Sequence, residues 1–157
     1  MSESENSSTA ASQSQCDELA AAVLRHCEAN HFKIAAAESL TGGLLADAFV
    51  RIPGASKVFL GSAVTYDIRA KAKILGVNAD LLAREGAVHP EVARQMAAGT
   101  AQLYRQTEDG DCVIGLATTG VAGPGPDGDK PAGLVYIGCP VASMAFVRVK
   151  QLLMSCV

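Results

Sequence analysis

One segment constrains the fold of this chain more than any other. It runs Ala35-Ala36-Ala37-Glu38-Ser39-Leu40-Thr41-Gly42-Gly43, a small apolar run that ends abruptly in an acid, two hydroxyls and two glycines. Apolar residues at helical spacing follow over residues 44–50. The segment therefore predicts a buried strand, a turn over residues 39–43, and a helix whose first backbone N–H groups are free. Such a turn can bind an anion or a developing oxyanion.

Ser39 has two interpretations, a reactive nucleophile or an ordinary helix N-cap. A serine at a strand-to-helix turn is most often a cap, and from the turn alone we favour the cap. The sequence has no G-x-S-x-G elbow, and His26, His31 and His89 lie on or beside predicted helix ends in polar surroundings. These features disfavour a Ser-His-Asp triad.

A serine nucleophile without histidine needs another base, and a lysine in a desolvated pocket is the usual substitute. Lys71 and Lys73 are the candidates, and both follow Tyr66, whose phenol could relay a proton or orient the lysine. The alternative is that both lysines are solvated helix residues and that Tyr66 is an anchoring aromatic. From the residues alone this alternative is favoured.

A second glycine-rich segment runs from Thr118 to Pro131 and follows the third predicted strand. It lacks the G-K-[ST] ending of a P-loop, and no helical pattern follows it, so a Walker site is excluded. The segment is either a plain long turn or a loop whose amides and threonine hydroxyls hold a phosphate or carbonyl oxygen. Its length favours a functional loop.

The hydrophobic pattern alternates strands with helices, and 157 residues suffice for one domain. We predict a three-layer α/β/α single domain with a mixed, mostly parallel sheet. Ligands bind beyond the carboxyl ends of strands in such sheets, so the Ser39 turn and the Thr119 loop can converge on one pocket. The expected strands cover residues 33–37, 58–66, 112–117, 134–138 and 144–149, and the expected helices residues 17–30, 44–51, 67–75, 78–84 and 90–103.

Composition bounds the remaining choices. Residues 1–15 are polar with nothing large and apolar, which predicts a disordered tail before a domain over residues 16–157. The start is acidic and polar, unlike a signal peptide, and no apolar run is long enough for a membrane span. Five scattered cysteines and a net charge of -3 argue against a disulfide framework, a zinc site and nucleic-acid binding. We expect a cytoplasmic protein with a small-molecule partner and no metal.

Short motifs at ordered spacings add a resemblance. They comprise residues 37–43, Pro53-Gly54-Ala55-Ser56, Phe59-Leu60-Gly61, Tyr66, Lys71, Leu75-Gly76-Val77, Gly86-Ala87-Val88, residues 119–124 and Lys130-Pro131-Ala132-Gly133. Over about residues 16–138 the chain closely resembles the C-terminal amidase domain of the CinA family. The best-described activity of that family is nicotinamide-nucleotide amidase, which hydrolyses nicotinamide mononucleotide to nicotinate mononucleotide and ammonia.

The resemblance implies roles for individual residues and reverses the weighting given above. Ser39 matches the nucleophile, Lys71 the base that takes its proton, and Tyr66 a polar partner of the pair, in a mechanism without metal or cofactor. Turn amides over residues 41–43 would hold the oxyanion. The implied substrate contacts are Glu38, Thr41, Gly42, Gly43, Thr119, Gly120, Ala122 and Gly123, of which Thr119 and the following glycines would face ribose or phosphate.

The sequence also departs from the family pattern. Leu40 replaces a small residue or cysteine, and His89 replaces a common serine cap. The resemblance implies a stand-alone amidase form, shortened at its C-terminus, in which Arg148 is a poor substitute for an arginine that pairs with phosphate. Apolar sheet surface uncovered there could be covered by a partner subunit, and we expect a homo-oligomer. The alternatives are a non-catalytic nucleotide-binding or regulatory homologue and an inactive interaction subunit.

Overall fold

The computed structural model describes the backbone of residues 3–141 and 144–151 and the side chains of residues 12–139. Helices and strands alternate along most of the described chain. The helices are α1 (Glu3–Ala29), α2 (Leu44–Val50), α3 (Ile68–Leu75), α4 (Ala79–Glu85) and α5 (Pro90–Tyr104), with short 3-10 turns at Ala55–Lys57 and Thr107–Asp109. The strands are β1 (Lys33–Glu38), β2 (Phe59–Val64), β3 (Val113–Gly120), β4 (Leu134–Val141) and β5 (Met144–Gln151).

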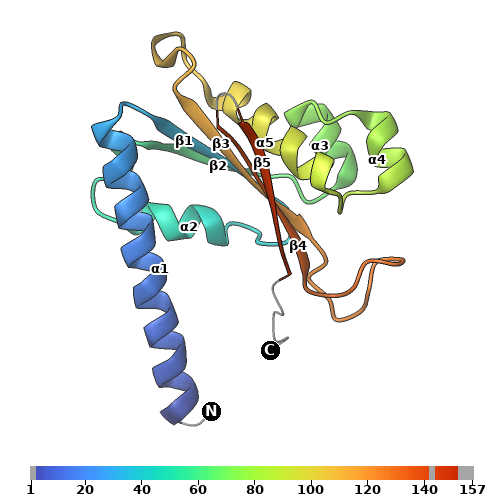
Figure 1. Ribbon diagram of the computed structural model, residues 1–157, viewed down its shortest axis with the longest axis horizontal. Coiled ribbons are helices and arrows are strands. Elements are labelled where there is room, and N and C mark those ends of the chain that lie inside the picture. Colours follow the sequence, from blue (N-terminus) through green and yellow to red (C-terminus); the bar gives the residue numbers. More distant parts are fainter. Residues whose placement is uncertain (1–2, 142–143, 152–157) are drawn as a thin grey trace.

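The strands form one sheet in the order β2-β1-β3-β4-β5 (Figure 1). Strand β1 is parallel to both β2 and β3, whereas β4 is antiparallel to β3 and to β5. Four strands therefore point in one direction and only β4 is reversed among the described strands. This arrangement confirms the mixed, mostly parallel sheet that the sequence predicts.

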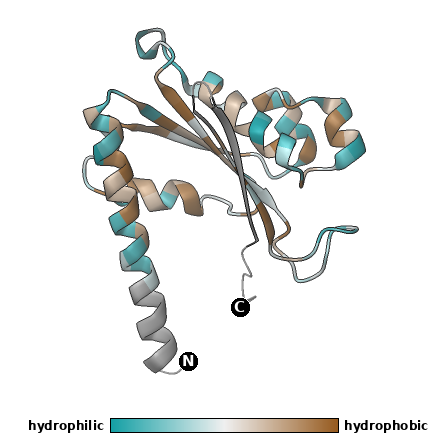
Figure 2. Ribbon diagram, viewed as in Figure 1, coloured by the Kyte–Doolittle hydropathy of each residue, from teal (hydrophilic) through white to brown (hydrophobic). Residues whose placement is uncertain are grey.

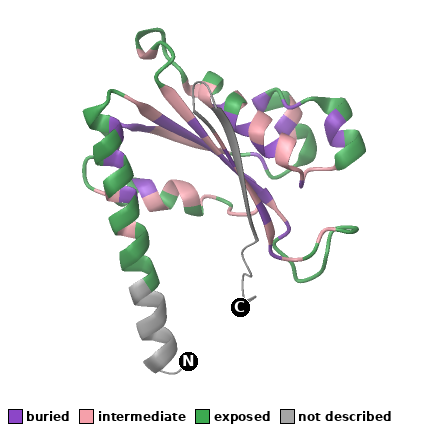
Figure 3. Cartoon of the chain, viewed as in Figure 1, coloured by how far each residue is buried: buried purple, intermediate pink, exposed green. Residues whose placement is uncertain are grey.

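Helices cover both faces of the sheet, which confirms the three-layer architecture (Figure 1). Helices α1 and α2 lie on one face, where Phe49 of α2 stacks on Phe59 of β2 with ring centroids 5.2 Å apart. Helices α3, α4 and α5 lie on the other face, where Met96 of α5 packs beside Ala37 of β1 and Ala117 of β3. Apolar residues gather between the layers, whereas the loop before β4 is hydrophilic and exposed (Figures 2 and 3).

Small residues let α5 approach the centre of the sheet closely. A Cβ at Gly115 of β3 would lie 1.8 Å from the backbone oxygen of Ala97 on α5, so no side chain fits there. Ala35, Ala36 and Ala37 of β1 are fully buried. The Thr100 hydroxyl on α5 donates a 2.9 Å hydrogen bond to the Ala36 carbonyl. The alanine run therefore sets a thin, tightly packed centre for the domain.

Several predicted boundaries differ from the structure, and β4, expected to end at Gly138, runs to Val141. The structure continues α1 back to Glu3, over residues for which composition predicts a disordered tail. That stretch contains alanine, glutamine and glutamate without proline or glycine, so a helix nucleated further along the chain can extend through it. Strand β3 continues to Gly120 instead of ending at Ala117, because pairing with the antiparallel β4 extends it. Local sequence carries no signal for a pairing with residues 15 or more positions away.

Candidate active site

The proposed chemical residues gather at the carboxyl end of the parallel strands. Ser39 follows β1, and its N–H donates to the carbonyl of Thr118 near the end of β3. Thr65 follows β2, and its N–H donates to the carbonyl of Glu38 at the end of β1. The first three strands thus deliver their loops to one edge of the sheet, as the topology argument predicts.

Ser39 and Lys71 meet at this edge although 32 positions separate them in sequence. The Lys71 ammonium lies 3.0 Å from the Ser39 hydroxyl, within hydrogen-bonding distance. Lys71 is fully buried, and Ser39 is also buried. The contact contradicts the interpretation of Lys71 as a solvated helix lysine. It also contradicts the N-cap interpretation of Ser39, because the N-cap of α2 is Gly43 and has no side-chain cap.

Helix α3 places Lys71 at the Ser39 hydroxyl. Asp67 caps the helix by accepting hydrogen bonds from the N–H groups of Arg69 and Ala70, which fixes where the helix begins. Lys71 lies one turn inside the helix, and Leu75, four residues later, shares its buried face. The side chain therefore points toward the end of β1 and away from solvent.

The Lys71 nitrogen has two further partners, the carbonyls of Thr65 at 2.6 Å and Tyr66 at 3.2 Å. As a cation the lysine can donate one proton to each of these carbonyls and one to Ser39. As a neutral amine it keeps two protons for the carbonyls, so its lone pair faces the Ser39 hydroxyl. Burial lowers the pKa of Lys71 to about 8, which brings the neutral form within reach near neutral pH.

Glu38 is the centre of a hydrogen-bonded network under the turn. Its carboxylate is fully buried and accepts five hydrogen bonds of 2.7 to 3.0 Å, from the hydroxyls of Thr41 and Ser62 and the N–H groups of Gly43, Leu45 and Ala46. Burial alone would raise the pKa of the Glu38 carboxyl, but these hydrogen bonds outweigh it and hold the pKa below its ordinary value. Both carboxylate oxygens already accept hydrogen bonds from the protein, which indicates a structural role for Glu38 in this conformation, and its implied contact with substrate stays a prediction.

The same network changes which turn amides remain for an oxyanion. The Gly43 N–H is bound by Glu38, and the Gly42 N–H donates to the Ser39 carbonyl at 3.2 Å. Neither amide is free, so two of the three expected donors are excluded. Within the described chain, the N–H groups of Leu40 and Thr41 have no acceptor. These two amides directly follow Ser39 and are the remaining candidates for an oxyanion hole.

Thr118 was missed by sequence reasoning, which selected the neighbouring Thr119. The Thr118 hydroxyl lies 2.7 Å from the Thr41 hydroxyl, which in turn donates to Glu38. Thr119 is fully buried and donates a 2.7 Å hydrogen bond to the carbonyl of Ala87. Alternation along β3 sends the two threonines to opposite faces of the sheet, so only Thr118 reaches the turn. Recognising β3 as continuing through both residues would have revealed this.

Tyr66 contributes to the pair through its backbone. Its carbonyl accepts from Lys71, whereas its side chain is 75% exposed. No hydrogen bond to the phenol occurs among the described residues. In this conformation the phenol forms no hydrogen bond with Lys71 and the Tyr66 side chain lines a cavity, so the expected role of the phenol in orienting the lysine stays a prediction.

That cavity, the Tyr66 cavity, has a volume of about 250 Å³. It lies between the turn, Tyr66 and the glycine-rich loop, defined here as residues 121–131. Of the implied substrate contacts, Gly120, Ala122 and Gly123 line it and Thr119 does not. Its lining residues are Leu40, Tyr66, Gly120, Val121, Ala122, Gly123, Gly125, Pro126 and Asp127. Arg148 lies outside the residues whose side chains the structure describes.

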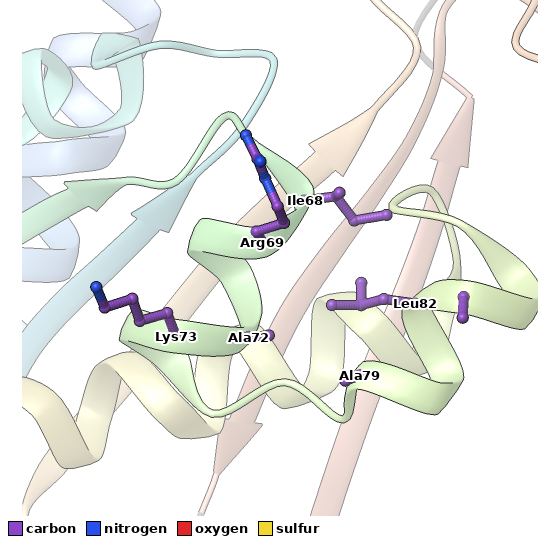
Figure 4. A pocket seen from close by; sticks show the side chains of 7 residues that line it. Ile68, Arg69, Ala72, Lys73, Ala79 and Leu82 are labelled. Atoms are coloured by element: carbon purple, nitrogen blue, oxygen red, sulfur yellow. The ribbon is translucent and has the colours of Figure 1, made fainter.

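A larger groove of about 520 Å³ lies between α3 and α4 (Figure 4). Ile68, Ala72 and Leu82 give it an apolar lining, and Arg69 and Lys73 lie at its border. Lys73 therefore lies on a different side of α3 from Lys71. It is not positioned to act as a base for Ser39. Neither Ser39 nor Lys71 lines this groove or the Tyr66 cavity. Only the Tyr66 cavity is lined by Leu40, which follows Ser39, and by Tyr66, whose carbonyl accepts a hydrogen bond from Lys71.

The described residues lack two features that would change how the site is interpreted. They contain no group of three or more histidine, cysteine or acidic side chains arranged to hold a metal ion. None of their helices combines the length and apolar character that a membrane span requires.

Comparison with known proteins gives consistent results. The family model for the CinA C-terminal domain matches residues 16–155. A CinA-like protein of Frankia casuarinae is 50% identical over 105 residues, which cover 67% of this chain. The chain spans only 23 to 31% of the length of the curated relatives that it matches.

Solved structures agree with this assignment. A CinA superfamily protein from Escherichia coli superposes with a TM-score of 0.77 at 31% identity, covering 87% of this chain and 77% of that chain. The competence/damage inducible protein CihA from Agrobacterium tumefaciens gives a TM-score of 0.76 at 34% identity, covering 87% and 79%. The expected fold and the expected family are both confirmed. The chain belongs to the CinA C-terminal domain family.

Proposed function

We propose that this chain is a serine/lysine amidohydrolase that converts nicotinamide mononucleotide to nicotinate mononucleotide and ammonia. The observation that carries the reaction class is the 3.0 Å contact between the Lys71 nitrogen and the Ser39 hydroxyl in a buried site. A serine whose only basic neighbour is a desolvated lysine is suited to acyl transfer. The choice of substrate rests on the family resemblance.

In the first step Ser39 attacks the amide carbon while the neutral Lys71 accepts the hydroxyl proton. The carbonyls of Thr65 and Tyr66 hold the lysine so that its lone pair faces the serine. The negative charge that develops on the amide oxygen would be stabilised by the free N–H groups of Leu40 and Thr41. Both amides follow the nucleophile in the chain, so their position is coupled to that of Ser39.

In the second step Lys71 returns the proton to the departing nitrogen, and ammonia leaves an acyl-enzyme ester on Ser39. Water then attacks the ester, and Lys71 takes one of its protons and returns it to the Ser39 oxygen. The products are the carboxylic acid and the regenerated serine. Each proton that Lys71 accepts is donated again, so the cycle needs no other acid or base.

The test is ammonia release from nicotinamide mononucleotide by the purified 157-residue chain. We expect Ser39→Ala to abolish release and Ser56→Ala, an exposed serine outside the site, to leave it unchanged. Mass spectrometry of the enzyme mixed rapidly with substrate should detect the acyl group on Ser39. Release that continues unchanged in Ser39→Ala would exclude the proposed nucleophile.

A different outcome would favour the alternative given above. If the wild-type chain binds the nucleotide saturably and releases no ammonia, it is a non-catalytic nucleotide-binding homologue. If it neither binds nor hydrolyses the nucleotide, the proposed substrate is wrong. The two measurements together separate these cases.

A further inference from the structure

Asp127 is the one charged side chain among the described residues that line the Tyr66 cavity. The other lining groups are backbone, small apolar side chains and the ring of Tyr66. A carboxylate beside an aromatic ring in a small cavity favours a positively charged ligand group and disfavours an anionic one.

The carboxylate of Asp127 is not used by the fold. Its backbone is fixed in a tight turn, where the N–H of Asp127 donates to the Lys130 carbonyl and the N–H of Lys130 donates to the Asp127 carbonyl. The side chain forms no ion pair and accepts no hydrogen bond within the described chain. Such a residue is positioned by its backbone and free to interact through its charge.

The nearest basic residue of the loop does not neutralise this charge. The Lys130 ammonium donates a hydrogen bond to the Glu85 carbonyl at the end of α4. A carboxylate close to a lysine in sequence usually loses much of its field to that lysine. Here no ion pair joins the two side chains among the described residues, so the Asp127 carboxylate is not neutralised by direct contact with Lys130.

The ring of Tyr66 also favours a positively charged ligand group. Its side chain is 75% exposed and lines the same cavity as Asp127. The face of an aromatic ring attracts a cation, and its bulk reduces the screening of a nearby charge by water. Leu40, which directly follows Ser39 in the chain, lines the cavity as well.

We infer that Asp127 is a specificity-determining residue that selects amides carried on a positively charged planar ring over neutral ones. The inference rests on the proposed function, since the pyridine ring of nicotinamide mononucleotide carries a positive charge at its substituted nitrogen. The free base nicotinamide has the same amide and ring but no charge. The charge on the ring, and not the amide itself, is then what Asp127 recognises.

The test compares two probes that differ in this charge and both lack phosphate, 1-methylnicotinamide and nicotinamide. Their dissociation constants are measured by calorimetry or ligand-observed NMR for the wild-type chain and for Asp127→Asn. We expect the wild type to prefer the cation by about five- to tenfold, and the preference to shrink as salt is raised. In Asp127→Asn the preference should fall to about one, with binding of neutral nicotinamide unchanged.

Asp129→Asn is the matched control, because Asp129 lies in the same turn and does not line the cavity. It should keep the wild-type preference. Equal binding of both probes by the wild type, no binding of either, or a preference that survives in Asp127→Asn would overturn the inference. Ammonia release from nicotinamide mononucleotide is measured on the same samples, so loss of the proposed activity with the charge preference intact is distinguished from failure of the inference.

Discussion

The two glycine-rich segments of this protein are built in opposite ways. The turn over residues 39–43 surrounds a single buried carboxylate, which receives hydrogen bonds from side chains and backbone on both sides of it. The glycine-rich loop is exposed over most of its length and is held by backbone pairs such as that between Asp127 and Lys130. The glycines of the turn therefore belong to a tightly hydrogen-bonded network, whereas those of the loop lie on an open surface.

This difference separates two tasks. A nucleophile, its base and an oxyanion hole must keep fixed positions, which the Glu38 network supplies. Recognition of a ligand can depend on a few exposed groups such as Asp127. Changes near the turn should therefore alter the chemical step or stability, whereas changes in the loop should alter affinity.

The largest expected effect is on the chemical step at Ser39. Lys71→Met should reduce turnover of nicotinamide mononucleotide by about 10³-fold or more, because Lys71 is the one base that contacts Ser39 among the residues with described side chains. Stability should be kept, since an apolar chain of similar length replaces a buried ammonium. Steady-state kinetics and thermal unfolding measure the two effects. Turnover within a few fold of wild type would show that Lys71 is not the base.

The next largest expected effect is on stability. It compares the buried carboxylate under the turn with a carboxylate on the surface. In Glu38→Gln the amide nitrogen must face at least one backbone N–H that Glu38 now accepts from, which leaves that donor unsatisfied. We expect a loss of about 2 kcal/mol in the free energy of unfolding. The control Glu28→Gln removes an exposed pair with Lys57 and should cost less than about 1 kcal/mol. Denaturant unfolding measures both losses. Equal losses would show that the buried carboxylate of Glu38 contributes no more to stability than an exposed ion pair does.

A smaller effect should appear in the pH dependence. The base form of Lys71 is neutral and its pKa is about 8, so kcat/KM should rise about tenfold between pH 7 and pH 9 and then level off. In the unfolded chain Lys71 has its ordinary pKa of 10.5 and stays protonated up to about that pH. The contribution of Lys71 to stability should therefore increase between pH 8 and pH 10.5. A flat profile across this range would mean that Lys71 does not titrate in the reaction.

The smallest effect concerns the boundary between the two regions. Tyr66→Phe should change turnover by less than about threefold, because the Tyr66 carbonyl holds Lys71 and the phenol hydroxyl has no hydrogen-bond partner in the described part of the chain. Its ring, which lines the cavity, is retained. A loss of tenfold or more in kcat would restore the phenol as a partner of the reacting pair.

Some features of the site follow from local sequence. The abrupt change from Ala37 to Ser39 marked the end of a buried strand and the start of the turn, and the helices expected over residues 78–84 and 90–103 begin within one residue of α4 and α5. Thr118 and Thr119 could not be separated in this way, because the end of β3 depends on its pairing with β4. The side of α3 that faces the site, and hence the choice between Lys71 and Lys73, likewise depends on packing.

The sequence by itself determined the alternation of strands and helices, the family, and the stretch in which a nucleophile would lie, because these depend on short-range patterns of apolar residues and glycines. Only the tertiary structure decided that Lys71 reaches Ser39, that Glu38 faces inward, and that Leu40 and Thr41 keep free amides. Hydrogen bonds are directional and short, so which groups pair depends on contacts between elements far apart in the chain. A pattern along one segment does not contain that information.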